Sequence, residues 1–467
     1  MSLFGALNSA TAGLRLIQSN VKLVSDNVTE ADNPTRTRHI LQKTTDATGR
    51  VQVATYTRQT DTALRIKLEE STARKGTETT RSEYLKKIGD LLGAGSGAPQ
   101  LTELAQKFSD TWRELETTPE SDTVQRDVIQ SGDRLANEIR RVSQGVEDLD
   151  RDLQDKTQDG ITELNKILKQ VDNINKDIVY VHSRGEPTDD LADQRDALLQ
   201  KVNELVGVRV LEREDGRVAV FTTGGLSLID AEATQLDYNG RDIVISNAPA
   251  NTVNQQMREG RLAALLEMRA DGSQQTPPAP VSQRPATEII RKLRDQLDTL
   301  ANSFTLPAAE GQPAGFNEAY NAAPTLEGEL QYRFFSGTDR FTIAMSEHLL
   351  TGEAKIKTGA IVAVTEAVTT SLRTFEADGL TMSETSYAGF ANGIVGLWST
   401  ASKSLSETAQ VATETHRLME VRYHSEVGVN IDEEMAHLQV LQTSYSATAH
   451  VVQTINAMFD ALERVVS

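Results

Sequence analysis

The feature that most constrains this fold is a pair of heptad patterns, one near each end of the chain. Near the C-terminus an apolar or aromatic residue recurs every seven positions, and a second row follows three residues after Leu438. Such rows place one apolar stripe along a helix, as in a coiled-coil seam. Asn430 is a favourable N-cap and Glu433 completes a capping-box signature, so we expect the helix to begin at Ile431. The two rows are Ile431, Leu438, Tyr445, Val452, Phe459 and Val466, and Leu441, Thr448, Ile455 and Leu462.

A matching pattern lies at the other end of the chain, where apolar residues are spaced 4-3-4-3-4-3-4 over 26 residues. Residues 1–60 carry seven Lys or Arg and four Asp or Glu, whereas residues 426–467 carry one and six. Opposite net charges, +3 and −5, favour lateral pairing of the two segments. We therefore expect the terminal helices to pack side by side. The N-terminal seam consists of Leu3, Leu7, Ala10, Leu14, Ile17, Val21, Val24 and Val28.

Composition narrows the function classes. The net charge of −19 argues against nucleic acid and against anionic membrane surfaces as partners. The chain has no cysteine, which excludes disulfides and thiolate metal sites. Residues 1–30 show no signal-peptide pattern, and the sequence holds no run of eighteen apolar residues. The expected location is therefore the cytoplasm, unless the chain leaves by a route that needs no cleaved signal.

Between the ends, the sequence predicts a bundle of long helices. Helix is expected over 64–92, for about eighty residues from Leu101, and again over 361–424. The heptad spacing within the second stretch indicates one helix of roughly 60 residues, about 90 Å long. We expect the acidic run Glu147–Asp155 to form its solvated face.

A β-rich segment interrupts the helices. Asp215-Gly216 and Asn239-Gly240 are hairpin-turn dipeptides within Val208–Ile245. A Pro-rich loop is expected at 271–287, a helix near 289–304 and strand material at 332–343. The predicted fold is thus mainly α with an inserted β-rich domain, in nested, discontinuous domains. Their expected bounds are 1–60 plus 425–467 for a terminal coiled-coil domain, 61–205 plus 361–424 for a long-helix bundle, and 206–360 for the β-rich insertion.

A search for chemistry finds one ambiguous spacing. Glu434-x-x-His437 is the pair used in carboxylate-bridged di-iron bundles, but the sequence holds no second copy. A solvated first turn explains these residues better, because acidic side chains favour helix N-termini. Phosphate-binding loops and nucleophile elbows are absent from the sequence, and Trp112 and Trp398 read as core residues. We expect no catalytic residue, no metal site and no cofactor.

Residues 428–452 look like the C-terminal signature of the bacterial flagellar axial proteins. The order Val-Asn-Ile-Asp-Glu-Glu at positions 429–434 is most similar to the hook-associated protein 1 family. The N-terminal motif of these proteins reads roughly Ser-x-Asn-Ile-Ala-Asn-x-Asn-x-Pro-Gly-Tyr, commonly followed by an arginine, which Arg38 matches. The chain departs from this motif at Glu30, Asp32, Thr35 and Arg36. The positions that match the two motifs are Ser25, Asn27, Val28, Pro34, Asn430, Asp432, Glu433 and Glu434.

This resemblance implies a structural, non-enzymatic role in the bacterial flagellum and in motility. It implies a ring of copies at the hook–filament junction, between hook protein and the second junction protein, hook-associated protein 3. The resemblance also implies export through the flagellar type III channel to the cell exterior, with a cytoplasmic chaperone on the C-terminal segment. Because two helices alone leave much of each apolar stripe wet, we expect the termini to fold when neighbouring copies complete the packing.

Alternatives remain at this point. Within the axial family the chain resembles hook, rod and second-junction proteins as well, although the Asn430–Glu434 sequence favours the first junction protein. A cytoplasmic coiled-coil adaptor would explain the heptads but would stay inside the cell. An iron enzyme would have to rely on Glu434 and His437.

Overall fold

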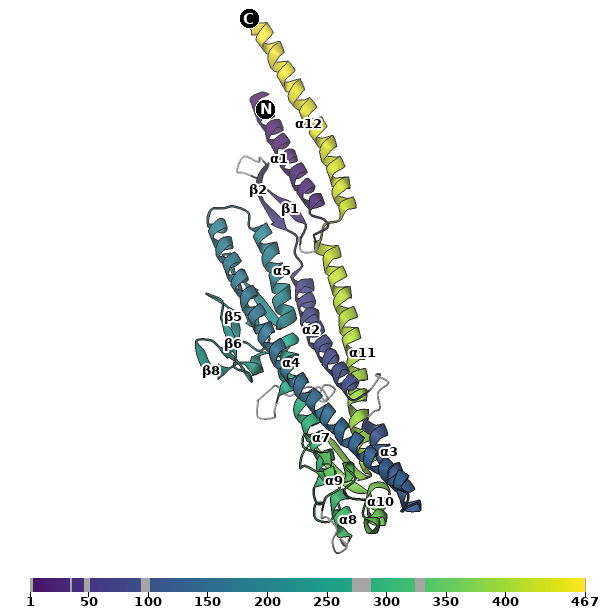
Figure 1. The fold of residues 1–467 in the computed structure, drawn as a ribbon. Helices are drawn as coiled ribbons and strands as arrows, with labels where there is room; N and C mark the ends of the chain where they lie inside the picture. The colour runs from purple at the N-terminus through teal and green to yellow at the C-terminus, as the bar shows by residue number, and fades with distance from the viewer. Residues whose placement is uncertain are drawn as a thin grey trace. The chain divides into compact units, whose positions relative to one another are not determined.

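A computed structural model describes residues 3–33, 36–45, 51–93, 101–270, 287–323 and 332–466. Long α-helices dominate, and five small antiparallel sheets lie among them (Figure 1). The helices are α1 (Leu3–Thr29), α2 (Thr62–Leu91), α3 (Leu101–Thr117), α4 (Asp122–Ser183), α5 (Asp189–Leu205), α6 (Arg261–Arg269), α7 (Ile289–Thr305), α8 (Phe316–Ala322), α9 (Glu347–Leu350), α10 (Ile361–Thr369), α11 (Tyr387–Val427) and α12 (Ile431–Val466). The strands are β1 (His39–Thr45), β2 (Val51–Arg58), β3 (Val208–Glu212), β4 (Val218–Thr222), β5 (Ser227–Ile229), β6 (Leu236–Tyr238), β7 (Ile243–Ile245), β8 (Ala248–Thr252), β9 (Phe335–Ser336), β10 (Ala344–Met345), β11 (Arg373–Ala377) and β12 (Leu380–Thr385).

The chain forms two compact units, each assembled from separate stretches of sequence. Unit 1 comprises Met1–Lys75, Thr162–Gln235 and Ala412–Ser467, and unit 2 comprises Gly76–Ile161 and Leu236–Val411. The mainly α fold with inserted β structure and discontinuous domains is confirmed. The three-domain division with bounds at 60/61, 205/206, 360/361 and 424/425 stays a prediction.

In unit 1, α2 and the end of α11 share a small apolar core. Leu68, Tyr423 and Val427 are buried there, and Leu64 and Met419 pack against them. The sheet β3-β4-β5 belongs to the same unit, and Asn175 joins it to α4 by donating to the carbonyl of Val218 and accepting from its amide. The predicted Asp215-Gly216 turn is confirmed, with Gly216 at a φ of 81°.

In unit 2, an aromatic cluster forms the core. Trp112 and Phe108 of α3 pack against Phe304 of α7 and Phe316 of α8, with ring centroids 5.4–6.3 Å apart. Trp112 and Trp398 are fully buried, as predicted. The Asn239-Gly240 turn is confirmed between β6 and β7, and α7 confirms the helix predicted near 289–304. The predicted Pro-rich loop lies outside the described residues, apart from residue 287.

The helix of roughly 60 residues is confirmed as α4, which has 62 residues and buries its predicted seam. Its acidic run is a solvated face only in part, because Asp148 and Asp155 are exposed but Asp150 is not. Asp150 is buried and lies 2.5 Å from Arg269 and 3.0 Å from Arg294, and Glu147 lies 2.5 Å from Arg294. Basic side chains of α6 and α7 therefore cover one side of this run, which the local charge pattern alone did not reveal.

Two further predictions were wrong. The stretch 361–424 is not one helix, because the β11–β12 hairpin separates α10 from α11. The hairpin turns at Asp378-Gly379, where Gly379 has a φ of 73°, so the same dipeptide signal was present in the sequence. At 332–343 the only strand in the described residues is the two-residue β9, paired with β10.

Candidate assembly interface

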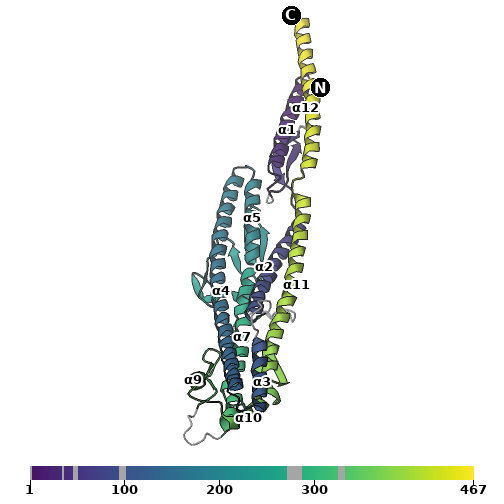
Figure 2. The same ribbon diagram turned by 45° about the vertical axis from the view of Figure 1, so that its right-hand side comes forward.

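The terminal helices α1 and α12 lie side by side, as Figures 1 and 2 both show. Gly13 faces Thr448 so closely that a Cβ added to it would lie 3.8 Å from the Thr448 methyl carbon. At the far end of the pair, the rings of Phe4 and Phe459 are 5.0 Å apart. The two helices are thus in contact along most of α1.

Most predicted seam residues lie at this contact. On α1 all eight are half-buried or buried, namely Leu3, Leu7, Ala10, Leu14, Ile17, Val21, Val24 and Val28. On α12 the buried or half-buried members are Leu438, Leu441, Thr448, Val452, Ile455 and Phe459. Long helices of this amphipathic kind gain most of their stability from such packing.

Among the seam residues of α12 whose side chains the structure describes, three remain exposed. Ile431, the first residue of the helix, is 46% exposed, and Tyr445 is 39% exposed. Leu462 is 50% exposed because it lies one turn past the Phe4–Phe459 contact, where α12 extends beyond the start of α1 (Figure 1). The seam that joins the helices is therefore shorter than the heptad pattern predicts.

The matched motif residues lie near the other end of the pair. Asn27 is buried, and its side chain donates to the carbonyl of His39 at 2.9 Å and accepts from its amide at 3.2 Å. Asn430 is the N-cap of α12 and accepts from the amides of Asp432 and Glu433 at 3.0 and 3.4 Å. Ser25 is exposed on α1, and Pro34 lies outside the described residues.

Glu433 and Glu434 bind an arginine from the other end of the chain. Arg38 Nε donates to Glu434 Oε1 at 2.7 Å, and its Nη1 donates to Glu433 Oε2 at 3.3 Å. Glu434 is 1% exposed, so this contact neutralises a buried carboxylate that would otherwise be strongly destabilising. Acidic residues in the first turn suit the helix dipole, but the predicted solvated turn is wrong for Glu434, which is buried beside Arg38.

A second ion-pair cluster, centred on Asp193 of α5, was missed from the sequence. Thr37 Oγ1 donates to Asp193 at 2.8 Å, His39 Nε2 lies 3.3 Å away and Arg58 Nη1 lies 3.4 Å away. Burial raises the pKa of Asp193, but its bonds to His39 and Thr37 and the charge of Arg58 outweigh burial and hold the pKa below its ordinary value. These partners are more than 130 positions apart, so no local spacing could reveal them.

α12 also carries an exposed apolar flank, which we define as Val440, Val451 and Met458 together with the exposed seam residue Leu462. These side chains are 49–61% exposed. At 3.6 residues per turn they fall within an arc of about 40° on the helix surface. Exposed apolar side chains aligned in this way indicate an interaction surface rather than chance exposure.

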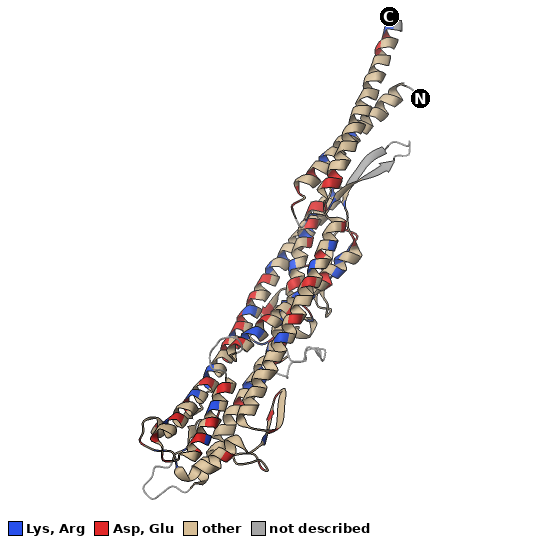
Figure 3. Cartoon of the chain, turned by 90° about the vertical axis from the view of Figure 1, so that its right-hand side faces the viewer, with Lys and Arg blue, Asp and Glu red and all other residues tan. Residues whose placement is uncertain are grey.

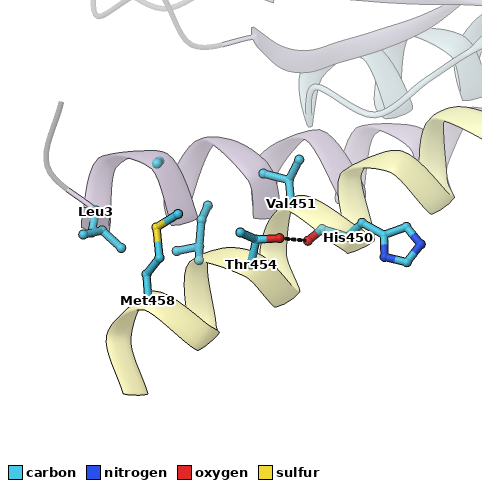
Figure 4. A pocket seen from close by; sticks show the side chains of 7 residues that line it. Leu3, His450, Val451, Thr454 and Met458 are labelled. Atoms are coloured by element: carbon cyan, nitrogen blue, oxygen red, sulfur yellow. Dashed lines mark hydrogen bonds between the residues drawn. The ribbon is translucent and has the colours of Figure 1, made fainter. Parts of the chain in front are cut away.

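The flank borders a groove at the start of α1. Leu3 and Met458 line it from the two helices, together with Val451 and Thr454 (Figure 4). The ring of His450 points away from the groove in the same view. The full lining is Leu3, Ala6, His450, Val451, Thr454, Ile455 and Met458.

The same surface carries almost no charge. Residues 435–459 of α12 and residues 3–14 of α1 contain no Asp, Glu, Lys or Arg. In Figure 3 the α1/α12 pair is mostly tan, whereas the long helices carry many blue and red charged residues. A surface without formal charge can meet an identical surface without repulsion.

The alternative iron site does not form in this arrangement. Glu434 is buried against Arg38, whereas His437 is exposed. Among the described residues, no group of three or more His, Asp or Glu side chains is placed to hold a metal ion. None of the described helices combines the length and hydropathy that crossing a bilayer requires.

Comparison with known proteins agrees with the motifs. Residues 85–335 match the family model of the flagellar hook-associated protein FlgK helical domain, and residues 423–465 match that of the flagellar basal body rod FlgEFG protein C-terminal region. The flagellar hook-associated protein 1 of Escherichia coli K12 is 22% identical over 98% of both chains. That of Bacillus subtilis 168 is 21% identical over 77% of this chain and 75% of its own length. A solved structure, the flagellar hook junction protein FlgK from Burkholderia pseudomallei, matches with a TM-score of 0.45 and 18% identity over 58% of this chain and 46% of its own.

Paired terminal helices with a C-terminal segment of the rod-protein type define a flagellar structural protein. Since the helical-domain match spans more than half of the sequence, the chain belongs to the flagellar hook-associated protein FlgK family. Its role is structural, at the hook–filament junction of the bacterial flagellum.

Proposed function

We propose that the α1/α12 pair is the element through which copies of this chain join one another in a junction ring. The observation that carries the proposal is the exposed apolar flank on a helix stretch without formal charge. The seam residues hold the two helices of one copy together, and the flank contacts the helices of neighbouring copies. Leu462 and Tyr445, exposed in the single chain, then become buried by neighbours.

Self-assembly explains why charge is excluded from this surface. In a ring of identical copies, each patch meets a patch of the same chain, so a charged residue at the contact would recur at every interface. Burying such a charge without a partner is costly, whereas apolar contacts tolerate repetition. The charged residues of α12 accordingly lie in its first turn and its last residues, outside 435–459.

The proposal extends to partners. On either side of the ring we place hook protein and the second junction protein, hook-associated protein 3. A cytoplasmic export chaperone would cover the C-terminal segment before the unfolded chain passes the flagellar type III channel without a cleaved signal. The role needs no catalysis and no cofactor. Export of an unfolded chain is compatible with the apolar seams of α1 and α12, because each seam becomes one continuous stripe only after its helix has formed.

A matched pair of substitutions tests the proposal. Val451→Glu puts a charge on the exposed flank, and Gln453→Glu puts the same charge on an exposed position across the helix. Val451→Glu should abolish filament attachment to hooks, as deletion of residues 428–467 should, whereas Gln453→Glu should retain it. Electron microscopy of cells carrying each variant provides the measurement. Equal filament numbers for Val451→Glu and wild type would refute the proposed interface.

The location of the chain distinguishes a flagellar component from a cytoplasmic coiled-coil adaptor. Shearing flagella from the cells and probing for the chain should find it in the flagellar fraction. Retention of all of the chain in the cytoplasm would favour an adaptor instead.

A further inference from the structure

The break between α11 and α12 is held by residues from the other end of the chain. α11 ends at Val427 and α12 begins at Ile431, so only three residues separate two long helices. The amide of Gly428 still donates to the carbonyl of His424 at 2.9 Å, as it would in a continuing helix. The interruption therefore concerns the hydrogen bonds of the next three amides.

In a continuous helix, the carbonyls of Glu426 and Val427 would accept from the amides of Asn430 and Ile431. Here other donors occupy both carbonyls. The backbone amide of Arg38 donates to Val427 O at 2.7 Å, and Gln59 Nε2 donates to Glu426 O at 2.7 Å. The N-terminal segment thus supplies donors to two of the three carbonyls whose helical partners the break removes.

The segment 36–39, which we call the strap, is fixed on both sides. Side chains of an extended segment alternate in direction. Thr37 and His39 bind Asp193 of α5, whereas Arg38 binds Glu433 and Glu434 of α12. In addition, the carbonyl of Arg38 accepts from the amide of Gln59 at 2.7 Å, which keeps both donors at the break.

The broken form requires glycine at position 428. A Cβ at this position would lie 2.4 Å from the carbonyl oxygen of His424, a distance that backbone atoms cannot tolerate. In an ordinary helix the same position accepts alanine, which favours helix more than glycine does. Alanine at position 428 should therefore favour the continuous helix, whereas glycine permits the break.

We propose that the α11–α12 break is a switch: the strap holds the two helices apart by occupying the carbonyls of Glu426 and Val427, and its release lets them join into one continuous helix. The broken form carries the α1/α12 pair that the proposed function uses. The continuous form would withdraw the first turn of α12 from Arg38 and misplace the pair. The proposal rests on the proposed function only for its effect on assembly.

Gly428→Ala tests the switch with a single methyl group. We expect the amides of residues 430 and 431 to exchange hydrogen about tenfold more slowly in the purified variant, because they gain helical acceptors. Gly396→Ala is the matched control, since Gly396 lies in α11 with open space around its added Cβ. It should leave exchange at 430 and 431 unchanged. Unchanged exchange in Gly428→Ala would overturn the proposal.

Releasing the strap should have the same effect. Combining Arg38→Ala, Gln59→Ala and Glu434→Gln removes the donor at Glu426, loosens the one at Val427 and leaves no buried unpaired carboxylate. Slower exchange at residues 430 and 431 is again expected. Fluorescence of Trp112 and Trp398, both in unit 2, verifies that the rest of the chain is folded. Faster or equal exchange at these amides in the folded triple variant would contradict the strap's role.

Rescue by proline separates the switch from a general folding defect. Proline is favoured at the first position of a helix but cannot lie inside one. Ile431→Pro should leave the broken form intact and should restore both fast exchange at residue 430 and filament attachment to the triple variant, in which Gly428 still fits the broken form. Failure to restore exchange would overturn the switch. Restored exchange without attachment would show that the α11–α12 break does not govern assembly, which contradicts the functional half of the proposal.

Discussion

Buried asparagine side chains bind the first residue of three strands. Asn27 binds the amide and carbonyl of His39, Asn175 those of Val218, and Asn317 those of Phe335. In each case one side chain supplies the donor and the acceptor that a neighbouring strand would supply. This explains why position 27 of the N-terminal motif is asparagine, since an apolar residue would leave two buried backbone groups unpaired.

Glu69 of α2 is a residue whose charge opposes folding. Burial raises the pKa of Glu69 to about 7, although Arg65 at 3.4 Å lowers it in part. In the unfolded chain the pKa is about 4.3. Between about pH 4.3 and about pH 7, Glu69 is therefore protonated in the folded state and ionised in the unfolded state. The contribution of Glu69 to the free energy of unfolding is therefore largest below about pH 4.3 and is lost as the pH rises through about 7.

Glu69→Gln removes this dependence. Relative to wild type, the variant should gain about 1–3 kcal/mol in free energy of unfolding between pH 5 and pH 8, because it has no proton to lose. Urea denaturation at both pH values, followed by circular dichroism, measures the difference. Glu116→Gln, at an exposed position of α3 that does not contribute to the pKa of Glu69, is the control and should show no such change. If the free energies of unfolding of Glu69→Gln and wild type differed by the same amount at both pH values, the raised pKa of Glu69 would be contradicted.

At the scale of elements, the sequence predicted the helices with long-period patterns. The heptads of α1, α4 and α12 fixed their positions, because one stripe must be buried along the whole helix. Asp-Gly and Asn-Gly dipeptides located two hairpins, yet the same signal at Asp378-Gly379 was missed within a stretch that resembled helix. The contacts of Arg38 with Glu434 join residues 396 positions apart, and no local period encodes such a pair.

The folding of the terminal helices stays a prediction at this scale. α12 exposes its whole flank in the single chain, and its seam rests on one helix only. Segments that lack enough burial alone often order when they bind. We expect amides of residues 5–28 and 432–462 to exchange rapidly in the monomer and to become protected in the flagellum. Hydrogen exchange detects the difference, and strong protection in the monomer would refute coupled folding.

At the level of the whole molecule, the proposed assembly depends on the two ends of the chain. Both ends belong to unit 1, together with the strap and α5, so the interface and the contacts that position it form one body. Unit 2 contains the aromatic core and both tryptophans. Substitutions at the flank should therefore impair assembly without changing tryptophan fluorescence.

The most direct test uses the absence of cysteine from the natural sequence. Val451→Cys places one thiol on the exposed flank, and Tyr180→Cys places one on the exposed surface of α4. A maleimide dye should label both variants in the purified monomer. In isolated flagella it should still label Tyr180→Cys but should no longer reach Val451→Cys, because neighbouring copies cover the flank. Labelling of Val451→Cys in flagella as complete as in the monomer would contradict the central claim.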